Sequence, residues 1–328
     1  TYSGRELISK VEIIPGNGRK FGTIPELGII YGREKISNQI FNTLISGNNI
    51  VLSGLPGIGK TSVARLISQL LLEDGWTVRW ASCNVDSDSQ NIAKMWIGKS
   101  APSDPKAIAT LFNPSKNLLV IDEIQEISNR HISSVNDLIS CCSECGIRIL
   151  LIVRAPNPLP NLENFNEVRI DGLSPSESLP IFSPELTEEE ALHISESLGG
   201  HPLALHLWSP EDKLPEKGEA VQEFVQKNVL KKLSSNAKES LDELCISPLP
   251  LGIKEISNED GIIELDESAI LRWKSSLFEP HHLIKNVRNA QFIDNQIKDL
   301  HSKQKKKWSE IEGVRARRME IYHSLKSS

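Results

Sequence analysis

The sequence predicts an α/β fold, a doubly wound parallel sheet followed by a small helical domain and a second small domain. Three observations support this prediction. A glycine-rich stretch joins an apolar, strand-like run at 49–52 to a helix-patterned run at 61–72, and a later apolar run, 117–121, ends in two carboxylates. Up to residue 171, apolar runs alternate with helical patterns, which is typical of βα units in a parallel sheet.

The glycine-rich stretch at 54–62 fits the pattern G-x-x-x-x-G-K-[ST] without a mismatch. Its glycines allow consecutive N–H groups to point at phosphate oxygens, and the following helix adds the positive end of its dipole. Lys60 would reach the β- and γ-phosphates of a nucleotide, and the Thr61 hydroxyl would bind Mg²⁺. The alternative is a strand-to-helix turn that binds nothing. We predict a P-loop NTPase whose loop residues are Gly54, Leu55, Pro56, Gly57, Ile58, Gly59, Lys60, Thr61 and Ser62.

The apolar run 117–121 predicts a strand buried on both faces, and Asp122 and Glu123 follow it. The carboxyl ends of strands form the edge at which α/β sheets bind ligands. Asp122 would bind Mg²⁺ directly or through water, and Glu123 would polarise the attacking water and accept its proton. An acidic loop after a buried strand is the alternative.

Arg154 ends the next apolar run, 147–154, at the same predicted edge. In that place it would sense the γ-phosphate of the nucleotide. The alternative is an exposed loop arginine before Pro156.

The bulk composition fits a protein of two or more domains. The 328 residues are 39% hydrophobic and 24% charged, and a formal net charge of −6 does not favour nucleic acid as a partner. No apolar run approaches the ~20 residues that span a bilayer, and no secretory signal is visible. Five cysteines favour a reducing cytoplasm, with Cys142 and Cys145 assigned to packing rather than to a metal. The chain begins at Thr1 rather than Met, so we expect a fragment of a longer protein.

The composition changes after residue 171, and five segments are expected. Asp171-Gly-Leu-Ser-Pro marks the main boundary, with Ser174 able to cap a helix. The segments are an extended leader (1–28), the P-loop nucleotide-binding domain (29–171), a helical domain (172–230), a winged-helix domain (231–290) and a charged, solvent-facing helical segment that would begin a helical-repeat sensor (291–328).

Several motifs occur in a characteristic order over residues 28 to 290. They are Tyr31-Gly32-Arg33-Glu34, the P-loop, Ile121-Asp122-Glu123, Val153-Arg154, Asp171-Gly-Leu-Ser-Pro, Gly199-Gly-His-Pro202-Leu-Ala-Leu205 and His281-His-Leu-Ile. In this order the chain resembles the STAND class of signal-transduction ATPases, particularly the NB-ARC-like branch of apoptotic scaffolds and immune receptors.

The resemblance implies a switch that holds ADP in a closed monomer and exchanges it for ATP when a sensor domain is relieved. The open form would assemble into a homo-oligomeric ring and activate an effector. The sensor and the effector would lie outside these residues.

The resemblance also implies contacts with the nucleotide. Pro202 would pack on it, Arg154 would contact its terminal phosphate, and His281 would reach the β-phosphate of ADP. His282 stands where the immune-receptor pattern has aspartate, so either histidine is a candidate for that contact. A helix-start proline and a satisfied helix histidine are the alternatives for Pro202 and His281. The segment beside the adenine would consist of Ile30, Tyr31, Gly32 and Arg33.

We therefore expect a cytoplasmic, slow ATPase that acts as a switch and has no membrane partner. The alternative is a DNA-binding ATPase, a loader or transcription regulator, that uses the winged helix and the basic residues at 303–307 and 315–318. Residues 233–280 carry more acidic than basic side chains, which counts against contacts with DNA phosphates.

Overall fold

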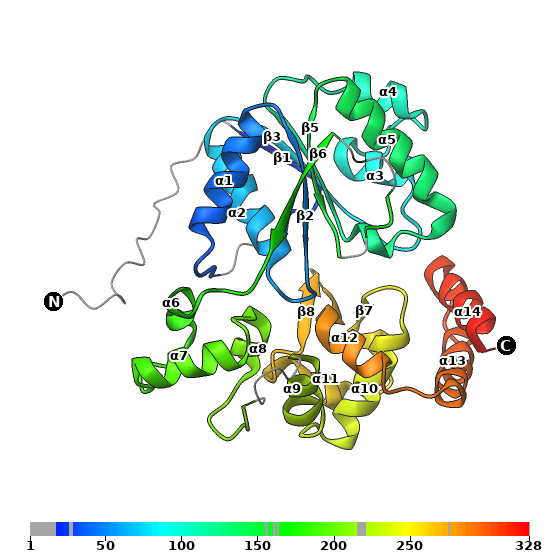
Figure 1. Ribbon diagram of the computed structural model, residues 1–328. Helices are drawn as coiled ribbons and strands as arrows, with labels where there is room; N and C mark the ends of the chain where they lie inside the picture. Colours follow the sequence, from blue (N-terminus) through cyan, green and yellow to red (C-terminus); the bar gives the residue numbers. More distant parts are fainter. Residues whose placement is uncertain are drawn as a thin grey trace. The chain divides into compact units, whose positions relative to one another are not determined.

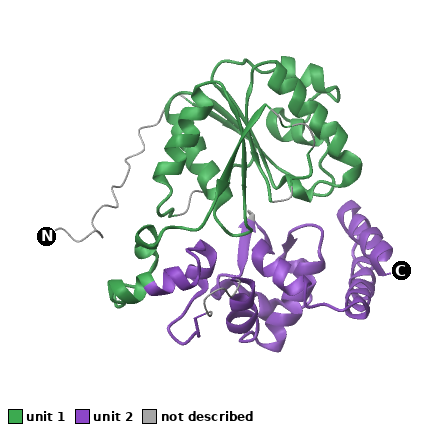
Figure 2. Ribbon diagram, viewed as in Figure 1, with its two compact units in different colours: residues 1–192 green, residues 193–328 purple. Residues whose placement is uncertain are grey.

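The computed structural model describes residues 18–25, 29–154, 157–159, 162, 164–214, 221–274 and 276–327. The chain divides into two compact units, residues 1–192 and 193–328, shown in green and purple in Figure 2. The division falls inside helix α7 (Glu188–Ser197), later in the chain than the boundary expected after residue 171. The limits of the helical domain therefore stay a prediction.

A six-stranded sheet lies at the centre of the first unit (Figure 1). Its order is β1-β3-β4-β5-β2-β6, and each neighbouring pair of strands is parallel. The predicted doubly wound parallel sheet is thus confirmed. The strands are β1 (Arg19–Phe21), β2 (Asn49–Gly54), β3 (Thr77–Ser82), β4 (Asn117–Asp122), β5 (Arg148–Ile152) and β6 (Phe165–Ile170).

Helices cover both faces of this sheet, and the side chains of β4 show why. Leu118 and Val120 pack into a core shared with α1 and α2, whereas Leu119 and Ile121 pack into a second core shared with α3, α4 and α5. Alternate residues of a strand point to opposite faces, so a continuous apolar run supplies both cores. The helices of this unit are α1 (Glu34–Ile45), α2 (Lys60–Glu73), α3 (Ser89–Ile97), α4 (Pro105–Thr110), α5 (Ile132–Glu144), α6 (Pro175–Ser178) and the first part of α7, with short 3₁₀ turns η1 (Ile124–Glu126), η2 (Asn129–His131) and η3 (Leu179–Ile181).

Strand β1 lies within the expected leader, for which the sequence predicted an extended segment and no place in the sheet. It pairs with β3 at the sheet edge, with Arg19 opposite Thr77, and the Arg79 guanidinium lies 4.0 Å from the centre of the Phe21 ring. Backbone pairing and a cation–π contact thus hold a strand that has no buried residues. Residues 1–17 and 26–28 of the leader lie outside the described residues.

The second unit combines helices with a three-stranded antiparallel sheet of order β7-β9-β8. Three helices, α10, α11 and α12, occur here together with short strands, the combination that suggested a winged helix, and that assignment stays a prediction. The elements of the second unit, after the end of α7, are α8 (Pro202–Leu207), α9 (Val221–Phe224), the π-helical η4 (Val225–Leu230), α10 (Ser235–Ile246), β7 (Leu251–Gly252), η5 (Ile253–Glu255), α11 (Glu259–Glu267), β8 (Leu271–Lys274), β9 (Leu277–Pro280), α12 (His282–Asn289), α13 (Asp294–Ser309) and α14 (Val314–Ser327).

The charged C-terminal segment forms two helices, α13 and α14, that pack against each other. A solvent-facing helix was expected, but Trp308 and His323 are buried at 1% exposure each. Lys307 pairs with the Glu243 carboxylate, and Arg315 pairs with Glu255 at 2.7 Å. Several charged side chains of this segment therefore hold it against η5 and α10. No helix within the described ranges is long and apolar enough to cross a membrane.

Candidate functional site

The P-loop is the turn between β2 and α2, at the carboxyl edge of the parallel sheet. Gly54 has a φ of +150°, and a Cβ at this position would lie 2.6 Å from the carbonyl oxygen of Ile170 in β6. Only glycine allows the loop to leave the sheet so close to the neighbouring strand. The Lys60 ammonium folds back over the loop, donating to the carbonyl oxygens of Gly54 (2.9 Å) and Leu55 (2.8 Å). The loop thus carries a positive charge at the start of α2, where the helix dipole also attracts anions.

The Thr61 hydroxyl, at the start of α2, and the Asp122 carboxylate, at the end of β4, lie side by side. The Thr61 hydroxyl donates to the Asp122 carboxylate, Oγ1 to Oδ2, at 3.1 Å. Asp122 is only 4% exposed, and its other oxygen accepts the backbone N–H of Glu123 at 2.8 Å. A hydroxyl beside a carboxylate is the kind of oxygen donor set that Mg²⁺ prefers. The residues that the sequence assigned to Mg²⁺ thus meet and fit that ion chemically.

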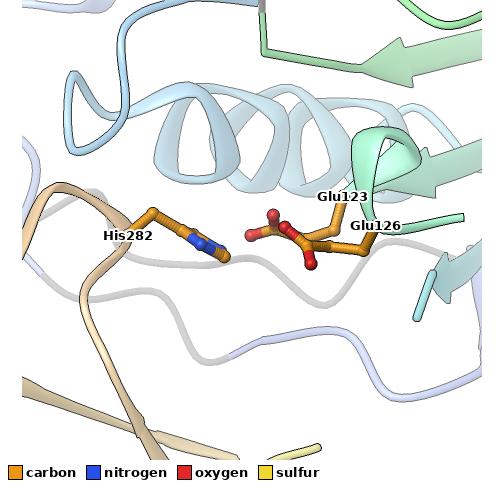
Figure 3. Close-up of side chains that lie close together, drawn as sticks. All are labelled: Glu123, Glu126 and His282. Carbon is orange, nitrogen blue, oxygen red and sulfur yellow. The ribbon is translucent and has the colours of Figure 1, made fainter. Parts of the chain in front are cut away.

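Glu123 lies just beyond the end of β4 in a left-handed backbone conformation, with a φ of +58°. It is 7% exposed, and one of its carboxylate oxygens accepts from the Gln125 side-chain amide at 2.5 Å. This carboxylate and that of Glu126 lie beside one another in Figure 3. A non-glycine residue at positive φ costs free energy and is common at functional sites.

Arg154 follows β5 and lies beside the same carboxylates. Its NH2 is 2.5 Å from Glu126 Oε1 and 3.7 Å from Glu123 Oε2. Its backbone N–H donates to Gln125 Oε1 at 3.0 Å. The arginine expected to sense the γ-phosphate is therefore paired with carboxylates and largely shielded, its side chain being 16% exposed. The alternative was an exposed loop arginine before Pro156, and Pro156 lies outside the described residues.

Sequence reasoning missed Gln125 and Glu126. The only signal was the spacing: Glu126 ends the 3₁₀ turn η1, three residues after Glu123, which precedes that turn in a left-handed conformation. Recognising it would have required knowing that the chain forms such a turn directly after β4.

The segment before α1 packs against the P-loop. The NH2 of Arg33 donates to the carbonyl oxygens of Ile58 in the loop (3.0 Å) and Asp171 after β6 (2.8 Å). Arg33 is 7% exposed; burial lowers the pKa of its guanidinium, and Glu177 and Asp171 oppose that shift. Gly32 has a φ of +61°, where a Cβ would come within 2.4 Å of Glu177 Cβ.

Ile30 and Tyr31 precede Gly32 and are half-buried. This segment thus braces the loop, while its predicted place beside the adenine stays a prediction.

Pro202 and His281 belong to the second unit. Pro202 is the first residue of α8, where the buried His201 caps the helix by accepting the N–H of Ala204 at 3.3 Å. His281 precedes α12, and burial, then the neighbouring Arg272, lower the pKa of its imidazole to about 4. His282 contacts the Arg272 guanidinium. Contacts of these residues with the nucleotide stay predictions.

Comparisons with known proteins agree with this geometry. Residues 50–158 match the family described as ATPase family associated with various cellular activities (AAA). The chain is 35% identical over 126 residues to Replication factor C subunit 1 from Arabidopsis thaliana, covering 35% of this chain and 13% of that protein. The fold is similar, with a TM-score of 0.67 and 17% identity, to that of a Signal Transduction ATPase with Numerous Domains (STAND) protein with a tetratricopeptide repeat sensor from Pyrococcus horikoshii. That match covers 93% of this chain and 49% of the archaeal one.

Proposed function

We propose that the chain is an ATPase that acts as a switch controlled by ATP and ADP, because residues 50–158 match the AAA ATPase family and the fold is similar to that of a STAND ATPase. The observation that carries the proposal is the meeting of Lys60, Thr61 and Asp122 at the sheet edge. The lysine ammonium lies over the loop, and the hydroxyl and carboxylate lie 3.1 Å apart. Together they provide a phosphate cradle and a place for a divalent cation.

In the proposed reaction, the loop N–H groups and Lys60 bind and orient the phosphates. Thr61 and Asp122 would hold Mg²⁺, which when bound neutralises charge that builds up on the phosphate oxygens. Glu123 orients a water molecule and accepts its proton. The water oxygen bonds to the γ-phosphorus as the bond to the β,γ-bridging oxygen breaks, so that ADP and inorganic phosphate leave. Arg154 stabilises negative charge on the γ-phosphate.

Slow turnover is supported by the pairing of the two residues assigned to hydrolysis. The Glu123 carboxylate accepts from Gln125, and Arg154 pairs with Glu126. A switch needs an element that binds ADP and ATP differently, because only differential affinity shifts a conformational equilibrium. We propose that Arg154 distinguishes ATP, and that Pro202 and His281 contact bound ADP. At neutral pH an imidazole with a pKa of about 4 is uncharged, and it can donate one N–H to a phosphate oxygen.

Activation would bring copies of the chain together into a homo-oligomer in the cytoplasm. Sensor and effector domains would belong to parts of the protein outside this segment. The archaeal protein with the similar fold has a tetratricopeptide repeat sensor, and the present chain spans about half of its length.

The test has two parts. The nucleotide that co-purifies with the protein is released and identified, and the molecular mass of the protein in solution is measured. We expect ADP on a monomer, slow ATP hydrolysis, and a larger species when ATP is supplied. Lys60→Ala should weaken nucleotide binding strongly. Rapid, continuous hydrolysis by a monomer without a trigger would instead indicate a motor-type ATPase.

A DNA-binding ATPase is the second candidate, supported by the similarity to a replication factor subunit over 126 residues. Its basic tail is partly neutralised, since Lys307 and Arg315 pair with Glu243 and Glu255. Fluorescence anisotropy of labelled duplex DNA, titrated with the protein at low and high salt, decides between the candidates. Salt-dependent binding would favour the second, and no binding at low salt would remove it.

A further inference from the structure

Two side chains of η1, Gln125 and Glu126, hold the residues assigned to γ-phosphate sensing and hydrolysis. We infer that these two side chains, which we call the η1 clamp, keep Arg154 and Glu123 in an off state that the γ-phosphate of ATP opens. The inference rests on the proposed function and deepens it, because it names how the site distinguishes ATP from ADP.

Glu126 binds the Arg154 guanidinium, the same group that we expect to bind the γ-phosphate. Its Oε1 lies 2.5 Å from the NH2 of Arg154, whose side chain is 16% exposed. Charge-assisted hydrogen bonds of this length are strong, and solvent screens the Arg154 side of the pair little, although 37% of the Glu126 side chain is exposed. A γ-phosphate must therefore displace a carboxylate before Arg154 can bind it. ADP has no γ-phosphate and leaves this ion pair in place.

Gln125 ties the sensing residue to the hydrolytic one. Its Nε2 donates to Glu123 Oε2 at 2.5 Å, and its Oε1 accepts the backbone N–H of Arg154 at 3.0 Å. A carboxylate requires a donor and an N–H requires an acceptor, so both partners fix the same orientation of the amide. Gln125 therefore links the backbone of Arg154 to the Glu123 carboxylate, so a shift of the chain at Arg154 is passed to the side chain that holds Glu123.

The carboxylates add a second link. Glu123 Oε2 lies 3.7 Å from the NH2 of Arg154, so the guanidinium charge is shared between Glu123 and Glu126. When Arg154 turns to a γ-phosphate, both carboxylates lose that charge, and Glu123 becomes a better acceptor for the proton of the attacking water. Recognition of ATP and preparation of Glu123 thus occur in one movement.

The experiment uses the full chain and the variants Glu126→Gln, Glu126→Asp and Glu144→Gln. Glu144 is an exposed residue at the end of α5, so its variant makes the same change of charge away from the site. Affinities for fluorescent ATP and ADP analogues are measured by titration, and kcat and KM are measured for ATP hydrolysis. Thermal unfolding of each variant shows whether it folds.

Glu126→Gln should bind the ATP analogue at least about fivefold more tightly than the wild type, the low end of typical couplings between two sites. Its ADP affinity should stay within about twofold, and its kcat should rise, because Arg154 and Glu123 are released together. Glu126→Asp, which keeps the charge on a shorter side chain, should fall between wild type and Glu126→Gln. A role in folding alone would not separate ATP from ADP.

Equal effects of Glu126→Gln and Glu144→Gln, or equal gains for ATP and ADP, would overturn the clamp while leaving the proposed function intact. If Glu126→Gln does not fold, the same comparison made with Glu126→Asp decides. If the wild type does not bind nucleotide, or if Lys60→Ala binds nucleotide as tightly as the wild type, the proposed function is wrong and the clamp with it.

Discussion

Replacing Arg33 by alanine should weaken nucleotide binding indirectly, by loosening the P-loop. The Arg33 guanidinium joins two segments that are far apart in the sequence, the loop at Ile58 and the end of β6 at Asp171. Truncation leaves both backbone carbonyl oxygens without this donor. Because the side chain is 7% exposed, solvent reaches the site poorly in the folded protein.

The size of the effect follows from the two hydrogen bonds. Hydrogen bonds to charged groups contribute about 1.5–3 kcal/mol each to the free energy of unfolding. Burial of the cation, seen in the lowered pKa of Arg33, offsets part of this contribution. We therefore expect Arg33→Ala to lower the free energy of unfolding by about 2–4 kcal/mol. Both hydrogen bonds come from the terminal NH2, so Arg33→Lys, which keeps a charged nitrogen on a shorter side chain, should lose part of that amount.

The assay is urea denaturation of the full chain, followed by titration with a fluorescent ADP analogue. Arg130→Ala is the control, because Arg130 pairs with Asp86 at 3.4 Å on the surface, with 67% of its side chain exposed. That variant should change the free energy of unfolding by less than about 1 kcal/mol. If Arg33→Ala loses nucleotide affinity while its stability matches the control, Arg33 acts on the nucleotide directly and the bracing role is wrong.

Three further outcomes are expected. Lys60→Ala should lose about 2–5 kcal/mol of nucleotide binding free energy, measured by titration, because it removes the cation at the phosphates. Glu123→Gln should lower kcat about 10²- to 10⁴-fold with nucleotide affinity retained, as removal of a proton acceptor does. Burial, then His301 and Lys307, lower the pKa of His323 from 6.5 to about 4, so the unfolded chain binds the proton more readily. The contribution of His323 to the free energy of unfolding is therefore complete above pH 6.5, and about 3 kcal/mol of it is lost as the pH falls from 6.5 toward 4. Urea denaturation at a series of pH values should show a smaller loss of stability for His323→Gln than for the wild type.

Local motifs allowed the first unit to be predicted. The run at β4 is apolar at every position that the two cores require, so its burial on both faces could be inferred without tertiary information. The P-loop pattern likewise fixes a strand, a turn and a helix in sequence order. The meeting of Thr61 and Asp122 follows from these two motifs, because parallel strands present their carboxyl ends at one edge.

Two features could not be predicted because their residues carry no hydrophobic pattern. Strand β1 has three exposed residues and is held by backbone pairing and by Arg79. The interface of α13 and α14 buries His301 and His323, whose Nδ1 atoms lie 2.8 Å apart. Histidines and lysines lower the mean hydropathy of a helix, so a packed polar seam has the same sequence pattern as a solvated face.

The neighbouring positions of β4 and β5 bring together the residues that we assign to sensing and to hydrolysis. The register places Ile121 opposite Leu151, so the residues that follow the two strands, Glu123 and Arg154, emerge together at the carboxyl edge. The sequence could place both at that edge, but it could not show that the arginine already pairs with Glu126. Any change at Arg154 therefore alters the charge around Glu123 as well. Substituting Arg154 removes the sensing group itself, whereas Glu126→Gln releases Arg154 and Glu123 together and leaves both of these side chains present.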